Sequence, residues 1–219
     1  MIQWKNIHTV LLDMDGTLLD LHFDNHFWLE HMPRRYAEER DLPLEVARAE
    51  LLKFYRDVEG TMDWYCLDFW TSQLDLDIAL LKEEVDHLIA VHPYVVEFLD
   101  AVRRSQRRVL LVTNAHFKSL DLKMQRTQLS GHFDQLICAH AFGVPKEDVS
   151  FWDKLQAVEP FERQHTLLID DSLSVLRSAR QYGIQHLLSV RKPDSKSPER
   201  SIEEFEAMAG FEQIMPHTE

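Results

Sequence analysis

The sequence has little cysteine and no long apolar run. Its two cysteines, Cys66 and Cys138, lie too far apart to form a CxxC pair. No apolar run approaches the roughly 20 residues that a membrane-spanning helix needs, so we expect no membrane partner. The opening residues, MIQWK, lack the apolar stretch of a secretion signal. We therefore expect a cytoplasmic protein whose cysteines are reduced and buried.

Positive charge is also scarce. The 219 residues include 24 lysines and arginines against 37 aspartates and glutamates, which gives a net charge of −13. Such a chain repels nucleic acids and anionic lipid head groups, so we expect neither as a partner. A phosphorylated small molecule would also be repelled, unless a metal ion or a well-placed lysine supplied positive charge locally.

Short apolar runs alternate with helical patterns along most of the chain. The runs occupy residues 9–13, 109–113, 136–139, 166–170 and 186–190. Each has the length of a strand that is buried on both faces. Apolar residues recur at helical spacing after Pro93, from Leu120 to near Gly131, around Trp152 and around Leu173. Strands that alternate with helices predict an α/β fold with a doubly wound, Rossmann-like parallel sheet.

One segment interrupts this alternation. Between about residues 20 and 92 there is no strand pattern, and helical patterns cover residues 44–58, 64–74 and 78–89. Ten of the 22 aromatic residues of the chain fall in this segment. We predict that residues 21–92 form an inserted α-helical cap, and that residues 1–20 and 93–219 form the α/β core.

Polar side chains gather where the predicted strands end. In an open parallel sheet, ligands bind beyond the carboxyl ends of the strands. The polar residues at these ends are Asp13, Asp15, Thr113, Asn114, Asp170 and Asp171, and Lys146 lies in the loop GVPKED after the third run. Carboxylates at one edge need a cation, and oxygen ligands without nearby His or Cys indicate Mg²⁺. The metal and Lys146 would make a cationic pocket for a phosphate monoester.

These motifs resemble those of the haloacid dehalogenase superfamily. The DxDGT motif of that family appears as DMDGT at residues 13–17, and Thr113, Lys146 and the Asp170–Asp171 pair match the other three motifs in order. The resemblance covers nearly the whole chain. It implies a phosphatase whose cap, of the C1 type, is inserted after the first motif, because only the interval between the first two motifs is long enough to hold it.

The resemblance also implies a role for each motif residue. Asp13 would be the nucleophile that forms an aspartyl-phosphate, and Asp15 the general acid that protonates the leaving group and then activates water. Thr113, the backbone N–H of Asn114 and Lys146 would bind the phosphoryl oxygens.

The same resemblance implies a ligand set for Mg²⁺. The carboxylates of Asp13 and Asp170 and the backbone carbonyl of Asp15 would hold the ion, and Asp171 would orient its waters. Structural alternatives stay open for these residues. DMDGT can be an Asx-turn, the Asp170–Asp171 pair can belong to a helix N-cap with Ser172, and Lys146 can be a solvated surface lysine.

Other functions share parts of this pattern. Asp15 argues against the dehalogenase branch, whose chemistry needs neither a general acid at that place nor Mg²⁺. A phosphomutase or a sugar-phosphate phosphatase of the superfamily is an alternative; the mutase shares DxDGT and a helical cap, and no feature of the sequence separates it from a phosphatase. The non-enzyme alternative is a phospho-accepting receiver domain, which also combines an acidic pair, a Thr and a Lys. There, however, the phosphorylated Asp ends a later strand and no large insert is present.

Within the phosphatases, several stretches resemble the bacterial purine nucleotidases of the superfamily, which act on GMP and IMP. They include FDNHFW and WYCLDFW in the predicted cap, and TNAH and FGVPKED in the core. The resemblance implies a purine nucleotide as substrate. Candidates for stacking on the base are Trp28, Trp64 and Tyr65, which are equally able to be core residues, and candidates for polar contacts are His22, Asn25, His26 and Asp68. His116 touches the substrate or caps a helix. We expect no zinc site at His22 and His26, because no third or fourth ligand follows them in pattern.

Overall fold

The structure is a computed structural model that describes residues 2–216. In these residues, six parallel strands form a single sheet. The strands are β1 (Thr9–Leu12), β2 (Arg108–Thr113), β3 (Gln135–Cys138), β4 (Thr166–Ile169), β5 (His186–Val190) and β6 (Glu206–Met208). Their spatial order is β3-β2-β1-β4-β5-β6, and every pairing is parallel. This order reverses direction at β1, which confirms the predicted doubly wound sheet.

The predicted strands match five of these six within about one residue. The first and fourth runs were predicted one residue too long, since β1 ends before Asp13 and β4 ends before Asp170. Strand β6 was not predicted. It is a three-residue strand at the edge of the sheet, and only Met208 of it is buried, so it leaves no apolar run in the sequence.

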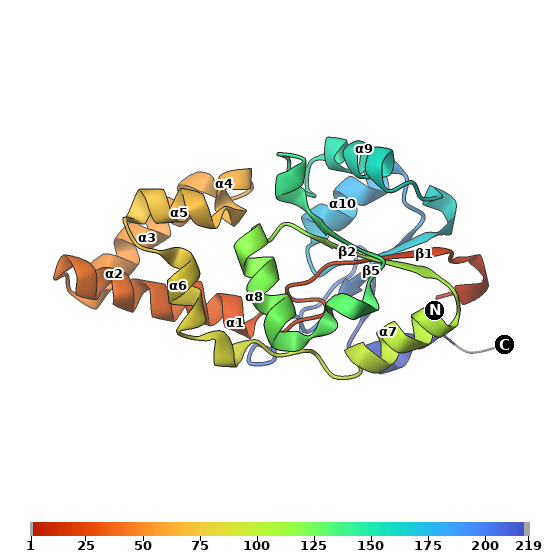
Figure 1. Cartoon of the computed structure of the whole chain (residues 1–219), viewed down its shortest axis with the longest axis horizontal. Coiled ribbons are helices and arrows are strands. Elements are labelled where there is room, and N and C mark those ends of the chain that lie inside the picture. Colours follow the sequence, from red (N-terminus) through yellow and green to blue (C-terminus); the bar gives the residue numbers. More distant parts are fainter. Residues whose placement is uncertain (1, 217–219) are drawn as a thin grey trace.

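Two layers of helices cover the two faces of the sheet (Figure 1). Helices α7 (Val95–Arg104) and α8 (Phe117–Thr127) pack on one face, and α9 (Val149–Val158) and α10 (Leu173–Tyr182) pack on the other. The side chains of β1 alternate accordingly: Val10 and Leu12 belong to the first apolar cluster and Leu11 to the second.

Two of these helices end at left-handed residues. Helix α8 ends at Thr127 rather than near Gly131 as predicted, because Gln128 adopts a φ of 57°. A short 3₁₀ turn then carries the chain to β3. Helix α10 ends at Tyr182, and the Gly183 that follows has a φ of 105°. Such 3₁₀ turns occur at Trp4–Asn6, Asp86–Leu88, Leu129–His132, Ala139–Ala141, Arg163–His165 and Phe211–Ile214.

The segment between β1 and α7 is helical and lies beyond one end of the sheet (Figure 1). It comprises α1 (His22–His26), a π-helical turn (Phe27–His31), α2 (Met32–Arg40), α3 (Leu44–Val58), α4 (Met62–Tyr65), α5 (Leu67–Leu74) and α6 (Ile78–Glu83). The helix predicted at 64–74 is split, because Cys66 has an extended backbone and begins a new helix. The helix predicted at 78–89 ends early, at Glu83. None of the helices in the described residues is long and apolar enough to cross a membrane.

This helical segment has an apolar core of its own. Its buried side chains, from Phe23 to Val85, form a third cluster that is separate from the two clusters of the sheet. The chain enters and leaves the segment at adjacent points: Leu19 pairs with Val91, the Asp20 N–H donates to Ala90 O at 2.9 Å, and the His92 N–H donates to Leu18 O at 2.9 Å. The two crossings therefore form a short antiparallel pair between the helices and the sheet.

Candidate active site

The polar residues predicted at the strand ends meet at one cavity. Asp13 follows β1 directly, Thr113 ends β2, Asp170 follows β4, and Lys146 precedes α9. These four side chains are buried. The cavity has a volume of about 320 Å³, within the usual range for a small-molecule site. Its lining includes all the residues predicted at the strand ends and Lys146: Asp13, Asp15, Thr113, Asn114, Lys146, Asp170 and Asp171. The sequence thus identified residues that the fold does bring together.

Lys146 connects two of the carboxylates at the base of the cavity. Its Nζ donates to Asp13 Oδ1 at 2.6 Å, to Asp170 Oδ2 at 2.7 Å and to the Val112 carbonyl at 2.9 Å. Burial disfavours the ammonium, but the two carboxylates outweigh it and raise the pKa of Lys146. The lysine is therefore charged, and it is not a solvated surface residue.

The carboxylates of Asp13, Asp170 and Asp171 offer a place for a divalent cation. One oxygen from each lies within 4.8 Å of the other two. Burial raises the pKa of each to about 6, although Lys146 opposes the shift at Asp13 and Asp170. So many buried carboxylates need positive charge beyond one lysine, and all the donors are oxygen. The residues present fit Mg²⁺.

Gly16 allows the DMDGT loop to lie against Asp171. Its φ is +82°, and a Cβ placed there would lie 2.8 Å from Asp171 Cγ. Two hydrogen bonds hold the other side of the contact: the Asp171 N–H donates to Thr17 Oγ1 at 3.1 Å, and Arg200 Nη2 donates to Asp171 Oδ2 at 2.7 Å. Only glycine fits this turn without strain.

Asp15 has a different lysine as its partner. Lys123 Nζ, from α8, donates to Asp15 Oδ1 at 2.6 Å and to Asp24 Oδ2 at 2.7 Å, and Lys82 Nζ donates to Asp24 Oδ1 at 2.8 Å. Burial raises the pKa of Asp15 to about 6 against the effect of Lys123. Burial alone would also raise the pKa of Asp24, but the two ammonium groups outweigh it and lower the value to about 2. A buried chain of alternating charges thus joins Asp15 to the helical segment.

Asn114 positions the lysine loop through its side chain. Its Oδ1 accepts from the Lys146 N–H at 2.9 Å, and its Nδ2 donates to Glu147 Oε2 at 2.9 Å. Glu147 Oε1 accepts in turn from the Tyr65 hydroxyl of α4 at 2.7 Å. Thr113 Oγ1 accepts from the Ala115 N–H at 3.0 Å, which fixes the hydroxyl at the end of β2.

Sequence reasoning missed the residues that support the motifs: Asp24, Lys82, Lys123, Glu147 and Arg200. One signal was available. Lys123 lies next to Met124 and three residues after Leu120, on the face of α8 that is apolar and buried. A lysine on such a face is nearly always paired with a buried carboxylate.

Aromatic side chains of the helical segment line the opposite wall of the cavity. They are Trp28, Tyr55, Trp64 and Tyr65. Trp28 and Trp64 also pack edge-on against Tyr55, with ring centroids 5.7 and 5.8 Å away, so each is a partly buried side chain that both packs on the helical core and lines the cavity.

The polar candidates of the helical segment differ in whether they line the cavity. Asn25 lines the cavity and donates to Asp194 Oδ2 at 2.7 Å. The cavity lining found among the described residues does not include His22, His26 or Asp68. His116 both caps α8, through its Nδ1, and lines the cavity.

This fold and this site define an enzyme built on a doubly wound sheet, with acidic groups and one buried lysine at the carboxyl edge. A family model for haloacid dehalogenase-like hydrolases matches residues 7–183. The chain therefore belongs to the haloacid dehalogenase-like hydrolases, as its motifs predicted.

Relatives and solved structures agree with this family. The chain is 37% identical to the GMP/IMP nucleotidase YrfG of Escherichia coli (strain K12) over 215 residues, 98% of this chain and 97% of the relative. The HAD phosphatase from Thermococcus onnurineus superposes with a TM-score of 0.79 at 20% identity, covering 95% of this chain and 96% of that one. The putative beta-phosphoglucomutase from Thermotoga maritima gives 0.67 at 19% identity, covering 95% and 97%. At these identities the structures show the shared fold alone.

Proposed function

We propose that the protein is a Mg²⁺-dependent phosphomonoester hydrolase that acts through an aspartyl-phosphate on Asp13. The carrying observation is the buried lysine that joins Asp13 and Asp170 at the base of the cavity. The carboxylates of Asp13 and Asp170 and the carbonyl of Asp15 would hold Mg²⁺, and Asp171 would orient its waters. When bound, the ion supplies positive charge to the phosphoryl oxygens.

The first half of the reaction forms the covalent intermediate. A carboxylate oxygen of Asp13 attacks phosphorus, the bond from phosphorus to the ester oxygen breaks, and Asp15 gives its proton to the departing alkoxide. Lys146, the Thr113 hydroxyl and the backbone N–H of Asn114 stabilise the charge on the phosphoryl oxygens.

The second half releases phosphate. Asp15, now a carboxylate, takes a proton from water as the water oxygen attacks the phosphorus of the aspartyl-phosphate. The bond between phosphorus and the Asp13 oxygen breaks, which regenerates both side chains and yields inorganic phosphate. Lys123 holds one oxygen of Asp15 and also contacts Asp24. The orientation of the Asp15 carboxyl group therefore depends on the ion pair between Lys123 and Asp24.

Residues 21–92 act as a cap over this site in our proposal, and residues 1–20 and 93–219 as the catalytic core. Three observations support this division: the separate apolar cluster of the helices, the adjacent crossings at Leu19 and Val91, and the helical residues in the cavity wall. Tyr65, which donates to Glu147, would link the cap to the core when the cap is closed.

The substrate that we propose is a purine 5′-mononucleotide, GMP or IMP. The relative at 37% identity is named for these nucleotides, and the cavity wall carries the rings of Trp28, Trp64 and Tyr65. Stacking of a base on one aromatic ring contributes about 1–3 kcal/mol, which is roughly a tenfold to hundredfold gain in binding. Asn25 is the polar candidate that already lines the cavity.

A panel of phosphate monoesters tests this proposal. With Mg²⁺ present, we expect kcat/KM to be higher for GMP and IMP than for AMP, UMP and glucose 6-phosphate. Trp28→Ala or Trp64→Ala should narrow the purine advantage. If glucose 6-phosphate matches GMP, a sugar-phosphate phosphatase takes the place of the nucleotidase, and if a sugar phosphate is isomerised without release of phosphate, the protein is a phosphomutase.

The cytoplasmic location stays a prediction.

A further inference from the structure

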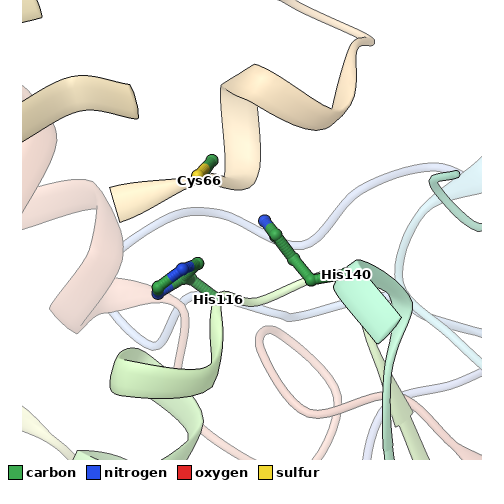
Figure 2. Close-up of side chains that lie close together, drawn as sticks. All are labelled: Cys66, His116 and His140. Carbon is green, nitrogen blue, oxygen red and sulfur yellow. The ribbon is translucent and has the colours of Figure 1, made fainter. Parts of the chain in front are cut away.

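A second cluster of potential metal ligands lies outside the carboxylate site. Cys66, His116 and His140 each offer one ligand atom, and these three atoms lie within 4.8 Å of one another (Figure 2). Cys66 lies between α4 and α5, His116 is the N-cap of α8, and His140 lies in the 3₁₀ turn after β3. The helical segment therefore supplies one side chain and the sheet segment two.

His140 has a buried nitrogen without a partner. Its Nε2 forms no hydrogen bond to any of residues 2–216, and Figure 2 shows this end of the ring directed towards Cys66. The other nitrogen, Nδ1, lies 3.8 Å from Cys138 Sγ, and the Cys138 thiol donates its own proton to Ala115 O at 3.0 Å. Nδ1–H is then the donor to the sulfur, so Nε2 carries a free lone pair. A buried polar atom left without a partner is rare and requires an explanation.

The other two side chains are held in place by hydrogen bonds: His116 Nδ1 accepts from the Lys118 N–H at 3.4 Å, a weak contact that an ion bound to His116 would replace. The His116 ring is buried and lies nearly perpendicular to the His140 ring, at a centroid distance of 5.0 Å. Cys66 Sγ accepts from the Phe69 N–H at 3.4 Å, which fixes the direction of the sulfur.

We propose that Cys66, His116 and His140 form a second metal site, which binds Zn²⁺ or a similar borderline-soft divalent ion. One sulfur and two imidazole nitrogens suit this class of ion, whereas Mg²⁺ prefers oxygen. Ligand atoms around a tetrahedral zinc lie roughly 3.3–3.6 Å apart, so movements of about 1 Å close the site. Asp68 Oδ2, 3.6 Å from His116 Nε2, or a water fills the fourth position. Binding releases the thiol proton of Cys66 to solvent.

The ion would connect the helical segment to the sheet beside the cavity. Cys66 belongs to the proposed cap, and His116 lines the cavity itself. A bound ion would hold the cap in the closed position and slow turnover. This effect on turnover rests on the proposed hydrolase function, whereas the binding of the ion does not.

Zinc binding to the purified, metal-free protein tests the site directly. In millimolar Mg²⁺, which saturates the carboxylate site, competition with a chromophoric chelator should show one tightly bound Zn²⁺ per chain. Cys66→Ser and His140→Gln should each weaken this binding about tenfold or more. Serine keeps an acceptor for the Phe69 N–H, so the helix cap survives the first change.

A matched control comes from another histidine cluster. His8, Glu162 and His165 also lie within 4.8 Å of one another, but Glu162 and His8 are exposed. His165→Gln should leave the tight binding unchanged. Binding that survives both Cys66→Ser and His140→Gln, or that disappears with His165→Gln, overturns the proposal, as does the absence of any Zn²⁺ retained in Mg²⁺.

Two further measurements identify the ligands. Co²⁺ in place of Zn²⁺ should give a thiolate charge-transfer band that Cys66→Ser removes, and Zn²⁺ should slow alkylation of Cys66 but not of Cys138. Turnover should fall with Zn²⁺ in the unsubstituted protein and much less in Cys66→Ser. If the band appears in a protein that hydrolyses no phosphate ester, the metal site stands and the proposed function fails. If hydrolysis occurs without a band, the metal site fails alone.

Discussion

Asp13 contacts a buried lysine in the structure and is proposed to attack phosphorus, and a substitution can remove the second role while keeping the first. We expect Asp13→Asn to abolish phosphate release while the protein stays folded. An amide does not attack phosphorus at a useful rate, but its oxygen still accepts a hydrogen bond from Lys146. Phosphate release and circular dichroism of the purified variant check this. Activity above a few per cent would show that another group is the nucleophile.

Asp15 provides a test of acid catalysis that depends on the leaving group. Asp15→Asn should slow hydrolysis of GMP far more than hydrolysis of p-nitrophenyl phosphate, because p-nitrophenolate leaves without much protonation. The ratio of kcat values for the two substrates, variant against unsubstituted protein, is the measurement. Equal losses on both substrates would mean that Asp15 acts in some way other than as general acid.

Gly16 can be compared with a second glycine of the same backbone conformation. Both Gly16 and Gly60 have a φ of +82°, but a Cβ at Gly60 meets no atom within 4 Å among the described residues, whereas one at Gly16 would press on Asp171. Gly60→Ala should cost about 1 kcal/mol of the free energy of unfolding, from backbone strain alone. Gly16→Ala should cost more and also reduce kcat. Chemical denaturation and steady-state kinetics measure both, and equal costs with unchanged kcat would contradict the contact.

At the scale of the element, α8 carries two lysines in opposite surroundings. Lys123 is buried between Asp15 and Asp24, and Lys118 is exposed and pairs with Asp68. Lys123→Met should destabilise the protein by about 3–5 kcal/mol, because two largely buried carboxylates lose the cation that they share. Lys118→Met, five residues earlier on the same helix, should change stability little, since its ion pair with Asp68 is exposed to water. Urea denaturation of both variants decides the point, and similar midpoints would mean that the buried chain of charges contributes nothing.

The elements differ in how far the sequence predicts them. Strands such as β1 and β4 are buried on both faces, so their apolar runs are continuous and easily recognised. Strand β6 is short and half-exposed, so its pattern is weak. The break at Cys66 depends on packing within the helical segment, which periodicity does not report. Helix α8 ends earlier than predicted because the single left-handed residue Gln128 terminates it.

The candidate site divides in the same way. Motif residues such as Asp13, Thr113 and Asp170 could be placed together from the sequence, since the carboxyl ends of parallel strands share one edge. Their supports could not. Lys123 lies 108 residues from Asp15, and Arg200 lies 29 residues from Asp171, so each contact depends on the completed fold. Only a charged residue on an apolar helix face, as at Lys123, leaves a local trace.

The whole molecule carries a net charge of −13, which makes a bound cation important for an anionic substrate. We expect EDTA to silence phosphate release and added Mg²⁺ to restore it. Zn²⁺ should not substitute at the carboxylate site, because the proposed ligands there are all oxygen and suit octahedral geometry. Phosphate assays after chelation and readdition of each ion test this expectation. Full activity in EDTA would contradict the metal requirement.

The adjacent crossings at Leu19 and Val91 also bear on how such a protein can change over evolutionary time. Because the segment between them starts and finishes at neighbouring points, its exchange for a shorter or differently shaped piece alters one surface loop of the sheet and leaves the strand order intact. The candidate catalytic residues at the ends of β1, β2 and β4 are encoded outside the exchanged piece. A lineage can therefore acquire a new substrate by recombination at two nearby positions without rebuilding its chemistry.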